Sequence, residues 1–127
     1  MSSPIILGVT VLTSLRASDL TQVGITKPLE EEVVHLASLA QQAGLGGVVA
    51  SPLEIEPLRR ACGKDMIIVT PGVRPQKGPR NDQVRVMTPA EAIQAGADYL
   101  VIGRPIRDAA DPLKATQEIL QEIRSVT

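Results

Sequence analysis

Aromatic residues are almost absent from this sequence. Among its 127 residues there is one Tyr and no Phe or Trp. Proteins that bind single-stranded nucleic acid stack the bases on aromatic side chains, so this composition excludes a platform of that kind. The formal net charge of −1, with basic residues scattered along the chain, offers no positive surface for a polyanion. We therefore expect no nucleic-acid partner and a core built from aliphatic side chains.

Cysteine and histidine occur once each. With Cys62 alone no internal disulfide can form, and its place before a helix-ending glycine predicts a small packed residue rather than a nucleophile. His35 has no Cys, His or Asp at ligand spacing, which predicts a residue at the core edge or the surface and no metal site. Neither a secretory leader nor a run of 18 apolar residues is present. These absences predict a soluble, cytoplasmic chain with no membrane partner.

Short apolar runs alternate with amphipathic stretches along the chain. The runs predict four strands, at 4–14, 46–51, 66–72 and 97–103. The amphipathic stretches predict one short helical turn within 18–26, capped by Ser18, and helices at 28–43, 52–63, 88–96 and 111–126. Strands that are apolar on both faces, each followed by a helix, favour parallel pairing with right-handed crossovers.

The expected helix boundaries depend on capping residues. Thr88 and Glu91 have the spacing of a capping box. Asp111 stands before a proline at the start of the last helix. The helix at 28–43 opens with Pro28 and three glutamates, which complement the positive end of the helix dipole rather than bind a metal, and it closes at Gly44.

Length decides between the architectures that this order allows. Four βα units in 127 residues make one domain, whereas a complete (βα)8 barrel needs about 250 residues. The segments QAGLGGVVAS (42–51) and QAGADYLVIG (94–103) both place a helix-end glycine before an apolar strand. We predict an α/β fold over residues 1–127 that is a parallel (βα)4 half of a TIM-type (βα)8 barrel. A small open α/β sheet is the alternative.

The last expected strand ends at Gly103, and Arg104 follows it. A glycine there lets the backbone approach a ligand, because no Cβ stands in the way. The planar guanidinium of Arg104 suits a dianionic phosphate. The pair predicts half of a phosphate cradle, and a simple turn followed by a solvated charge is the alternative.

The long irregular stretch at 70–85 follows the third expected strand and is rich in Pro, Gly and basic residues. Loops after the carboxyl ends of strands carry the chemistry of α/β folds, so this loop is a candidate for ligand binding. Arg74 and Gln83 are its candidate binding residues, and solvated loop side chains are the alternative. Lys77 and Arg80 are expected to be solvated, although they could attract an anionic substrate.

Several of these segments together resemble the C-terminal half of bacterial orotidine 5′-phosphate decarboxylase. The resemblance covers essentially the whole chain, in order, and the combination is far more specific than any one segment. The segments are VTVLTSLRASDL (9–20), GVVASPLE (47–54), TPGVRPQ (70–76), NDQVRVMTPAEAIQAGADYLVIGRPI (81–106) and DAADPLKA (108–115).

The resemblance implies a role for each candidate residue. Thr13 matches the hydroxyl residue that hydrogen-bonds the pyrimidine, and Pro71 matches the turn beside the base. Arg74 matches a ligand-binding position. Gln83 matches the residue on the loop that closes over the phosphate. The phosphate-binding pair of the family matches Gly103 and Arg104.

The reacting residues of the family are missing from this sequence. The decarboxylation, which needs no cofactor, depends on an Asp-x-Lys-x-x-Asp motif, and this motif occurs nowhere in the chain. The resemblance therefore implies a substrate-binding half that lacks catalytic residues and is inactive alone. Its expected ligands are orotidine monophosphate and uridine monophosphate. A half-barrel would expose sheet edges and apolar surface, which predicts a homodimer or a partner chain that supplies the N-terminal half-barrel.

Two other functions remain open at this point. One is a non-catalytic half-barrel that assembles with itself and binds at most a nucleoside monophosphate or phosphate. The absent Asp-x-Lys-x-x-Asp motif favours it for the isolated chain. The other is a related sugar-phosphate decarboxylase, which would need the same missing aspartates.

Overall fold

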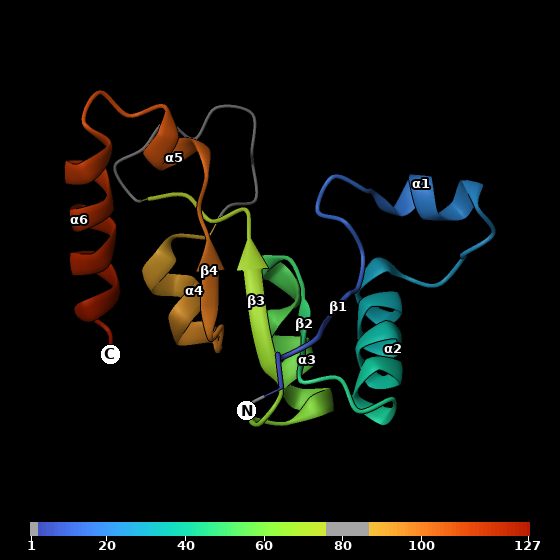
Figure 1. The fold of residues 1–127 in the computed structure, drawn as a ribbon. Helices are drawn as coiled ribbons and strands as arrows, with labels where there is room; N and C mark the ends of the chain where they lie inside the picture. The colour runs from blue at the N-terminus through green and yellow to red at the C-terminus, as the bar shows by residue number, and fades with distance from the viewer. Residues whose placement is uncertain (1–2, 76–86) are drawn as a thin grey trace.

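The chain folds around one parallel sheet. The computed structural model describes residues 3–75 and 87–127. Four strands lie side by side in chain order and every neighbouring pair is parallel (Figure 1). They are β1 (Leu7–Val9), β2 (Gly47–Val49), β3 (Ile67–Pro71) and β4 (Tyr99–Val101). The predicted (βα)4 order is confirmed.

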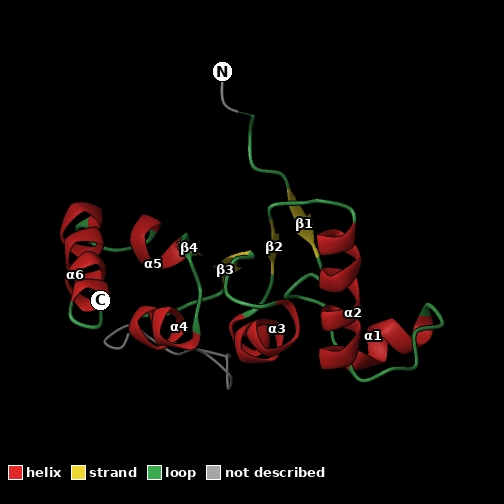
Figure 2. Ribbon diagram, turned by 90° about the horizontal axis from the view of Figure 1, so that it is seen from below, coloured by secondary structure: helices red, strands yellow, loops and turns green. Residues whose placement is uncertain are grey.

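Helices connect the strands and cover one face of the sheet. They are α1 (Ala17–Gln22), α2 (Leu29–Gln42), the 3-10 turn η1 (Pro52–Glu54), α3 (Ile55–Cys62), α4 (Pro89–Ala95), α5 (Arg104–Arg107) and α6 (Pro112–Arg124). Figure 2 shows α2, α3 and α4 on one side of the strands, while the N-terminal segment projects from the other side. The short helix α5 was not predicted from the sequence.

The capping residues act as predicted from their spacing in the sequence. The Thr88 hydroxyl accepts a hydrogen bond from the Glu91 amide at 3.2 Å, and the Glu91 carboxylate accepts one from the Thr88 amide at 3.0 Å. Asp111 accepts a bond from the amide of Lys114 at 3.1 Å. After the carboxyl end of α2, Gly44 has a φ of +89°, a conformation that glycine adopts without strain.

Two local predictions were wrong. Helix α1 begins at Ala17, so Ser18 lies inside its first turn and does not cap it. The amide of Arg16 instead donates to the Asp19 carboxylate at 2.8 Å, because a carboxylate three residues into a helix reaches back to the first free amide. The strand expected at 4–14 extends only over Leu7–Val9, and a turn closed by the Leu15 amide and the Leu12 carbonyl follows it.

The core lies between the sheet and the helices. Side chains alternate between the two faces of a strand, so every second residue points into this layer. Val48, Ile68 and Thr70 are almost fully buried there, against Ile55 and Leu58 of α3. Cys62 is buried as predicted.

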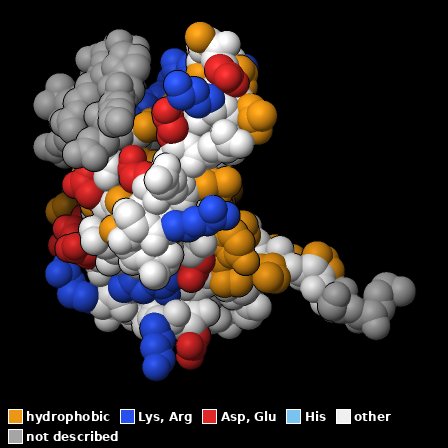
Figure 3. Space-filling model, turned by 90° about the vertical axis from the view of Figure 1, so that its left-hand side faces the viewer, with side chains coloured by type: hydrophobic (Ala, Val, Ile, Leu, Met, Phe, Trp, Pro, Cys, Tyr) orange, Lys and Arg blue, Asp and Glu red, His pale blue; other side chains and the backbone are white. Residues whose placement is uncertain are grey.

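The opposite face of the sheet has no covering layer among the described residues. We call it the open face, and the alternation of the strands assigns to it Leu7, Val9, Gly47, Val49, Ile67, Val69, Pro71, Tyr99 and Val101. Val9, Tyr99 and Val101 are 60%, 59% and 53% exposed. On this face β1 and β4 are therefore largely exposed, which is the apolar surface expected of a half-barrel. Figure 3 shows hydrophobic side chains gathered on the side from which the N-terminal segment projects.

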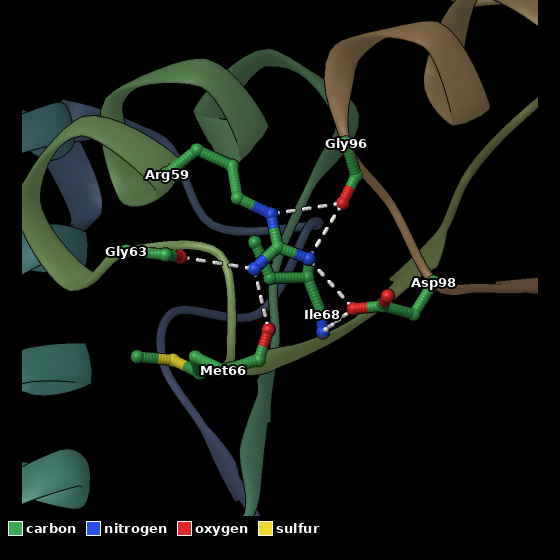
Figure 4. A network of polar contacts seen from close by, with 6 residues as sticks. All are labelled: Arg59, Gly63, Met66, Ile68, Gly96 and Asp98. Carbon is green, nitrogen blue, oxygen red and sulfur yellow. Dashed lines mark hydrogen bonds and ion pairs between the residues drawn. The ribbon is translucent and has the colours of Figure 1, made fainter.

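A network around Arg59 joins α3 to the segments that enter β3 and β4 (Figure 4). The Arg59 guanidinium donates twice to the Gly96 carbonyl, at 3.0 and 2.7 Å, and binds the Asp98 carboxylate at 2.6 Å. It also donates to the carbonyls of Gly63 and Met66. Asp98 in turn accepts a bond from the Ile68 amide at 2.9 Å. The network lies at the amino end of the sheet, where barrel residues serve stability rather than catalysis.

Candidate functional site

The candidate residues that the structure describes follow the carboxyl ends of three strands. Thr13 follows β1, Arg74 follows Pro71 at the end of β3, and Gly103 and Arg104 follow β4. Because all four strands are parallel, these ends meet at one edge of the sheet, the upper edge in Figure 1. Ligands of α/β folds bind at this edge.

The position of Gly103 leaves its backbone open. A Cβ built on Gly103 would meet no atom within 4 Å in the part of the chain that the structure describes, so a ligand can approach this part of the backbone. Arg104, the first residue of α5, is exposed, and no carboxylate in the described ranges pairs with it. By contrast, Arg107 donates to the Asp108 carboxylate at 3.1 Å. Arg104 is thus the guanidinium of α5 that is available to an anion.

The end of β3 lies directly beside the end of β4. Pro71 and Val101 are paired in the ladder, which puts Gly103 two residues beyond a neighbour of Pro71. Gly72 has a φ of +80°, in agreement with the predicted turn. The amide of Arg74 then donates to the Met87 carbonyl at 3.0 Å. The sheet therefore brings the backbones that carry Arg74 and Arg104 to neighbouring strand ends.

Thr13 stands apart from this pair. It is exposed in the turn after β1, and β2 separates its strand from β3. The hydroxyl of Thr10 donates to the Val49 carbonyl at 2.9 Å and fixes the start of that turn against β2. Thr10 was not singled out from the sequence, although two threonines three residues apart at a strand end were a visible signal. Gln83, Lys77 and Arg80 lie outside the described residues.

The described residues bring together no group of three or more His, Cys, Asp or Glu side chains that could hold a metal ion. His35 is exposed on α2, one of the two positions predicted for it. No helix in the part of the chain that the structure describes is long and apolar enough to cross a membrane.

Glu54 is a buried carboxylate next to the carboxyl end of β2, and sequence reasoning missed it. The residue is 8% exposed, and Oε2 has no hydrogen-bond partner within the described ranges. Burial raises the pKa of this carboxyl above its ordinary value; a backbone hydrogen bond at Glu54 acts in the opposite direction, and the negative charge of Glu30 adds to the rise. Glu54 follows a serine at capping-box spacing, yet the structure shows no side-chain cap there.

We expect Glu54→Gln to stabilise the chain at neutral pH. The raised pKa means that the folded state holds the proton more tightly, so wild-type stability falls as the pH rises from the ordinary pKa of the carboxyl through the raised one. The advantage of the variant should grow over this window and then stay constant. Urea unfolding between about pH 4 and pH 8 measures it. Glu56→Gln, which removes an exposed carboxylate from α3, is the control, and an advantage independent of pH would contradict the argument.

Comparison with known proteins places the chain in a family. A family model described as "Orotidine 5'-phosphate decarboxylase / HUMPS family" matches residues 2–119. The orotidine 5'-phosphate decarboxylase of Geobacter sulfurreducens is 63% identical over 118 residues, which are 93% of this chain and 49% of the relative. That of Trichlorobacter lovleyi is 61% identical over 120 residues, 94% of this chain and 50% of the relative.

Solved structures give the same result. The crystal structure of orotidine 5'-phosphate decarboxylase from Lactobacillus acidophilus matches with a TM-score of 0.81 and 37% identity, over 96% of this chain and 50% of that chain. An uncharacterized conserved protein from Geobacillus kaustophilus matches with a TM-score of 0.74 and 36% identity, over 92% and 47%. The chain thus spans about half the length of the relatives it matches, and the predicted half-barrel fold is confirmed. The chain belongs to the orotidine 5'-phosphate decarboxylase / HUMPS family.

Proposed function

We propose that this chain supplies the substrate-binding half of an orotidine 5′-phosphate decarboxylase. The reaction converts orotidine monophosphate to uridine monophosphate: the bond between ring carbon C6 and the carboxylate breaks, CO2 leaves, and C6 takes up a proton. The observation that carries the proposal is the exposed Gly103–Arg104 pair at the ligand-binding edge, in a chain about 60% identical to proteins of that name. The proposal includes the cytoplasmic location predicted from the sequence.

In this proposal each residue binds or orients the substrate. Arg104 and the backbone at Gly103 hold the phosphate, and Arg74 adds a second positive charge from the neighbouring strand end. The Thr13 hydroxyl forms a hydrogen bond with the pyrimidine, and Pro71 contacts the same ring. Phosphate contacts lie far from the bond that breaks, and their binding energy serves to position the reacting ring.

The chemical step needs groups that this sequence lacks. No Asp-x-Lys-x-x-Asp motif occurs in it, so it offers no lysine and aspartate pair for the protonation of C6. We expect the isolated chain to show no turnover and to need the N-terminal half-barrel from a partner chain. A purified chain that decarboxylates orotidine monophosphate alone would overturn this division of labour.

We expect Arg104→Ala to weaken the binding of uridine monophosphate roughly 10- to 100-fold, because a charge-assisted contact of about 1.5–3 kcal/mol is lost. Calorimetric titration measures the change, with uridine as the ligand that lacks the phosphate. Arg107→Ala removes a guanidinium one turn further along α5 that already pairs with Asp108, so it is the matched control. Equal affinity in Arg104→Ala and wild type would reject the phosphate cradle.

Gly103→Ala tests the backbone half of the cradle. The added methyl group meets no atom of the described residues within 4 Å, so folding should be unaffected while the approach of the phosphate is blocked.

One alternative function keeps its support. A non-catalytic half-barrel that assembles with itself and binds a nucleoside monophosphate or phosphate at most would also show phosphate-dependent binding without turnover. Addition of the separate N-terminal half of a relative distinguishes the two functions, since recovered turnover supports the decarboxylase.

A further inference from the structure

We infer that Thr10 is a positioning residue for the pyrimidine ring: its hydroxyl determines where Thr13 stands relative to Pro71. The inference rests on the proposed function, in which Thr13 and Pro71 contact the ring. Thr10 follows β1 and acts on the ligand only through the backbone, by way of one peptide unit at the end of β2.

Thr10 joins the end of β1 to β2 through two hydrogen bonds. Its hydroxyl donates to the Val49 carbonyl at 2.9 Å, and its amide donates to the same oxygen at 3.3 Å. The hydroxyl bond is the shorter one and is partly buried, so water competes with it poorly. The ladder between the two strands ends at Val9 and Val49, and the bonds of Thr10 extend this pairing by one residue.

The turn that carries Thr13 begins shortly after Thr10. The Leu15 amide donates to the Leu12 carbonyl at 2.9 Å, which closes a four-residue turn with Thr13 at its second position. Val11, between Thr10 and this turn, packs against the core. Thr13 is itself exposed, so the position of its hydroxyl depends on the backbone of the turn, and that backbone is anchored at Thr10.

The peptide unit between Val49 and Ala50 connects this turn to β3. Its carbonyl accepts the two bonds from the end of β1, and its amide donates to the Val69 carbonyl at 3.1 Å. Because the peptide unit is planar and trans, these two groups point to opposite sides. Pro71 follows Val69 by two residues in the same strand. The turn that bears Thr13 and the strand end that bears Pro71 are therefore held at a set separation by this one peptide unit.

The residues proposed to bind the phosphate lie outside this connection. Gly103 and Arg104 follow β4, which joins the sheet through its ladder with β3. Loss of the Thr10 hydroxyl should therefore displace Thr13 and leave the Gly103–Arg104 pair in place. We expect an effect confined to the base of the ligand, which a general loss of stability would not produce.

Calorimetric titration of the chain with two ligands tests the inference. We expect Thr10→Val to bind uridine monophosphate about 3- to 10-fold more weakly than wild type, because one hydrogen bond that holds the turn is lost. Valine keeps the branched shape of threonine and removes the hydroxyl. The affinity for ribose 5-phosphate, which lacks the base, should be unchanged. Thr10→Ser retains the hydroxyl and should bind both ligands as wild type does.

Thr116→Val is the matched control. The Thr116 hydroxyl also donates to a main-chain carbonyl at 2.9 Å, that of Pro112 at the start of α6. Helix α6 follows β4, whereas the turn with Thr13 follows β1 at the other end of the strand order (Figure 1). This variant loses a bond of the same kind and length, and it should bind both ligands as wild type does.

Amide hydrogen exchange tests the position of the turn without any ligand. The Leu15 amide closes the turn, so we expect it to exchange faster in Thr10→Val than in wild type, and at the wild-type rate in Thr10→Ser. The Ile68 amide, which donates to Asp98 at the amino end of the sheet, is the reference, since a general loss of stability would accelerate the exchange of both amides.

The outcomes separate this inference from the proposed function. A wild-type chain that binds neither ligand would reject the proposed function and, with it, the role of Thr10 toward the ring. Equal affinity of wild type and Thr10→Val for uridine monophosphate would reject the inference alone. An equal loss of affinity for ribose 5-phosphate, or an unchanged exchange rate of the Leu15 amide, would do the same. A loss confined to uridine monophosphate and recovered in Thr10→Ser would support it.

Discussion

Arg59→Ala should lower the free energy of unfolding by about 3 kcal/mol or more. The guanidinium makes five hydrogen bonds to Gly63, Met66, Gly96 and Asp98, and it is the group that connects α3 to the amino ends of β3 and β4. Only 17% of its side chain is exposed, so water replaces these bonds poorly. The alanine variant removes the Arg59 donor from three carbonyl oxygens and from the Asp98 carboxylate, which keeps, within the described residues, only its bond from the Ile68 amide.

Urea unfolding of both proteins measures this loss. Arg59→Lys should recover only part of the stability, because an ammonium group lacks the planar fork that reaches three carbonyls and a carboxylate at once. Arg60→Ala is the control: the side chain of this next residue is 74% exposed, and its one ion pair within the described residues, with Glu30, has a separation of 4.0 Å. Exposed pairs of this kind contribute about 0–1 kcal/mol. Equal losses in Arg59→Ala and Arg60→Ala would contradict the structural role of Arg59.

Gly47→Ala is the second substitution for which we expect a large effect, a loss of about 3 kcal/mol or more. A Cβ on Gly47 would meet the main chain of β3, with the Ile67 carbonyl carbon only 2.9 Å away and its oxygen closer still. Backbone atoms of a paired strand cannot move aside without breaking the ladder between β2 and β3. We expect a lower unfolding midpoint, and a weakened sheet in circular dichroism.

The neighbouring glycine provides the control for Gly47. A Cβ on Gly46 would lie 2.7 Å from Cγ2 of Ile5, which is the side chain of a residue 60% exposed. That side chain can rotate into solvent, so Gly46→Ala should cost much less than Gly47→Ala. If both variants unfold at the same urea concentration, the close approach of β2 and β3 is not the cause.

Local features of the fold could be predicted from the sequence because their physics is local. Thr88, Glu91 and Asp111 cap helices through bonds that span three residues, so spacing alone reveals them. The order of strands and helices follows from alternating apolar and amphipathic runs. Strand lengths could not be predicted in this way, because a strand ends where its backbone pairing with the neighbouring strand ends. The apolar run around β1 is long, yet its ladder with β2 covers only Leu7–Val9.

The candidate site shows the same division. Thr13, Arg74 and Gly103 were expected at or just after strand ends, and parallel pairing is sufficient to bring those ends to one edge. The role of Arg59 was not predictable, because its partners Gly96 and Asp98 are 37 and 39 residues away. The burial of Glu54 likewise depends on packing against elements distant in sequence.

The position of the Arg59 network has a consequence for protein engineering. Its members lie at the amino end of the sheet, and none belongs to the turn after β1 or to the α5 segment after β4. Loops from other family members could therefore be grafted onto the carboxyl edge while the hydrogen bonds of Arg59 at the opposite end stay intact. In such variants the amino end of the four-strand unit would maintain thermal stability, while the loops at the carboxyl end could be changed to alter ligand preference.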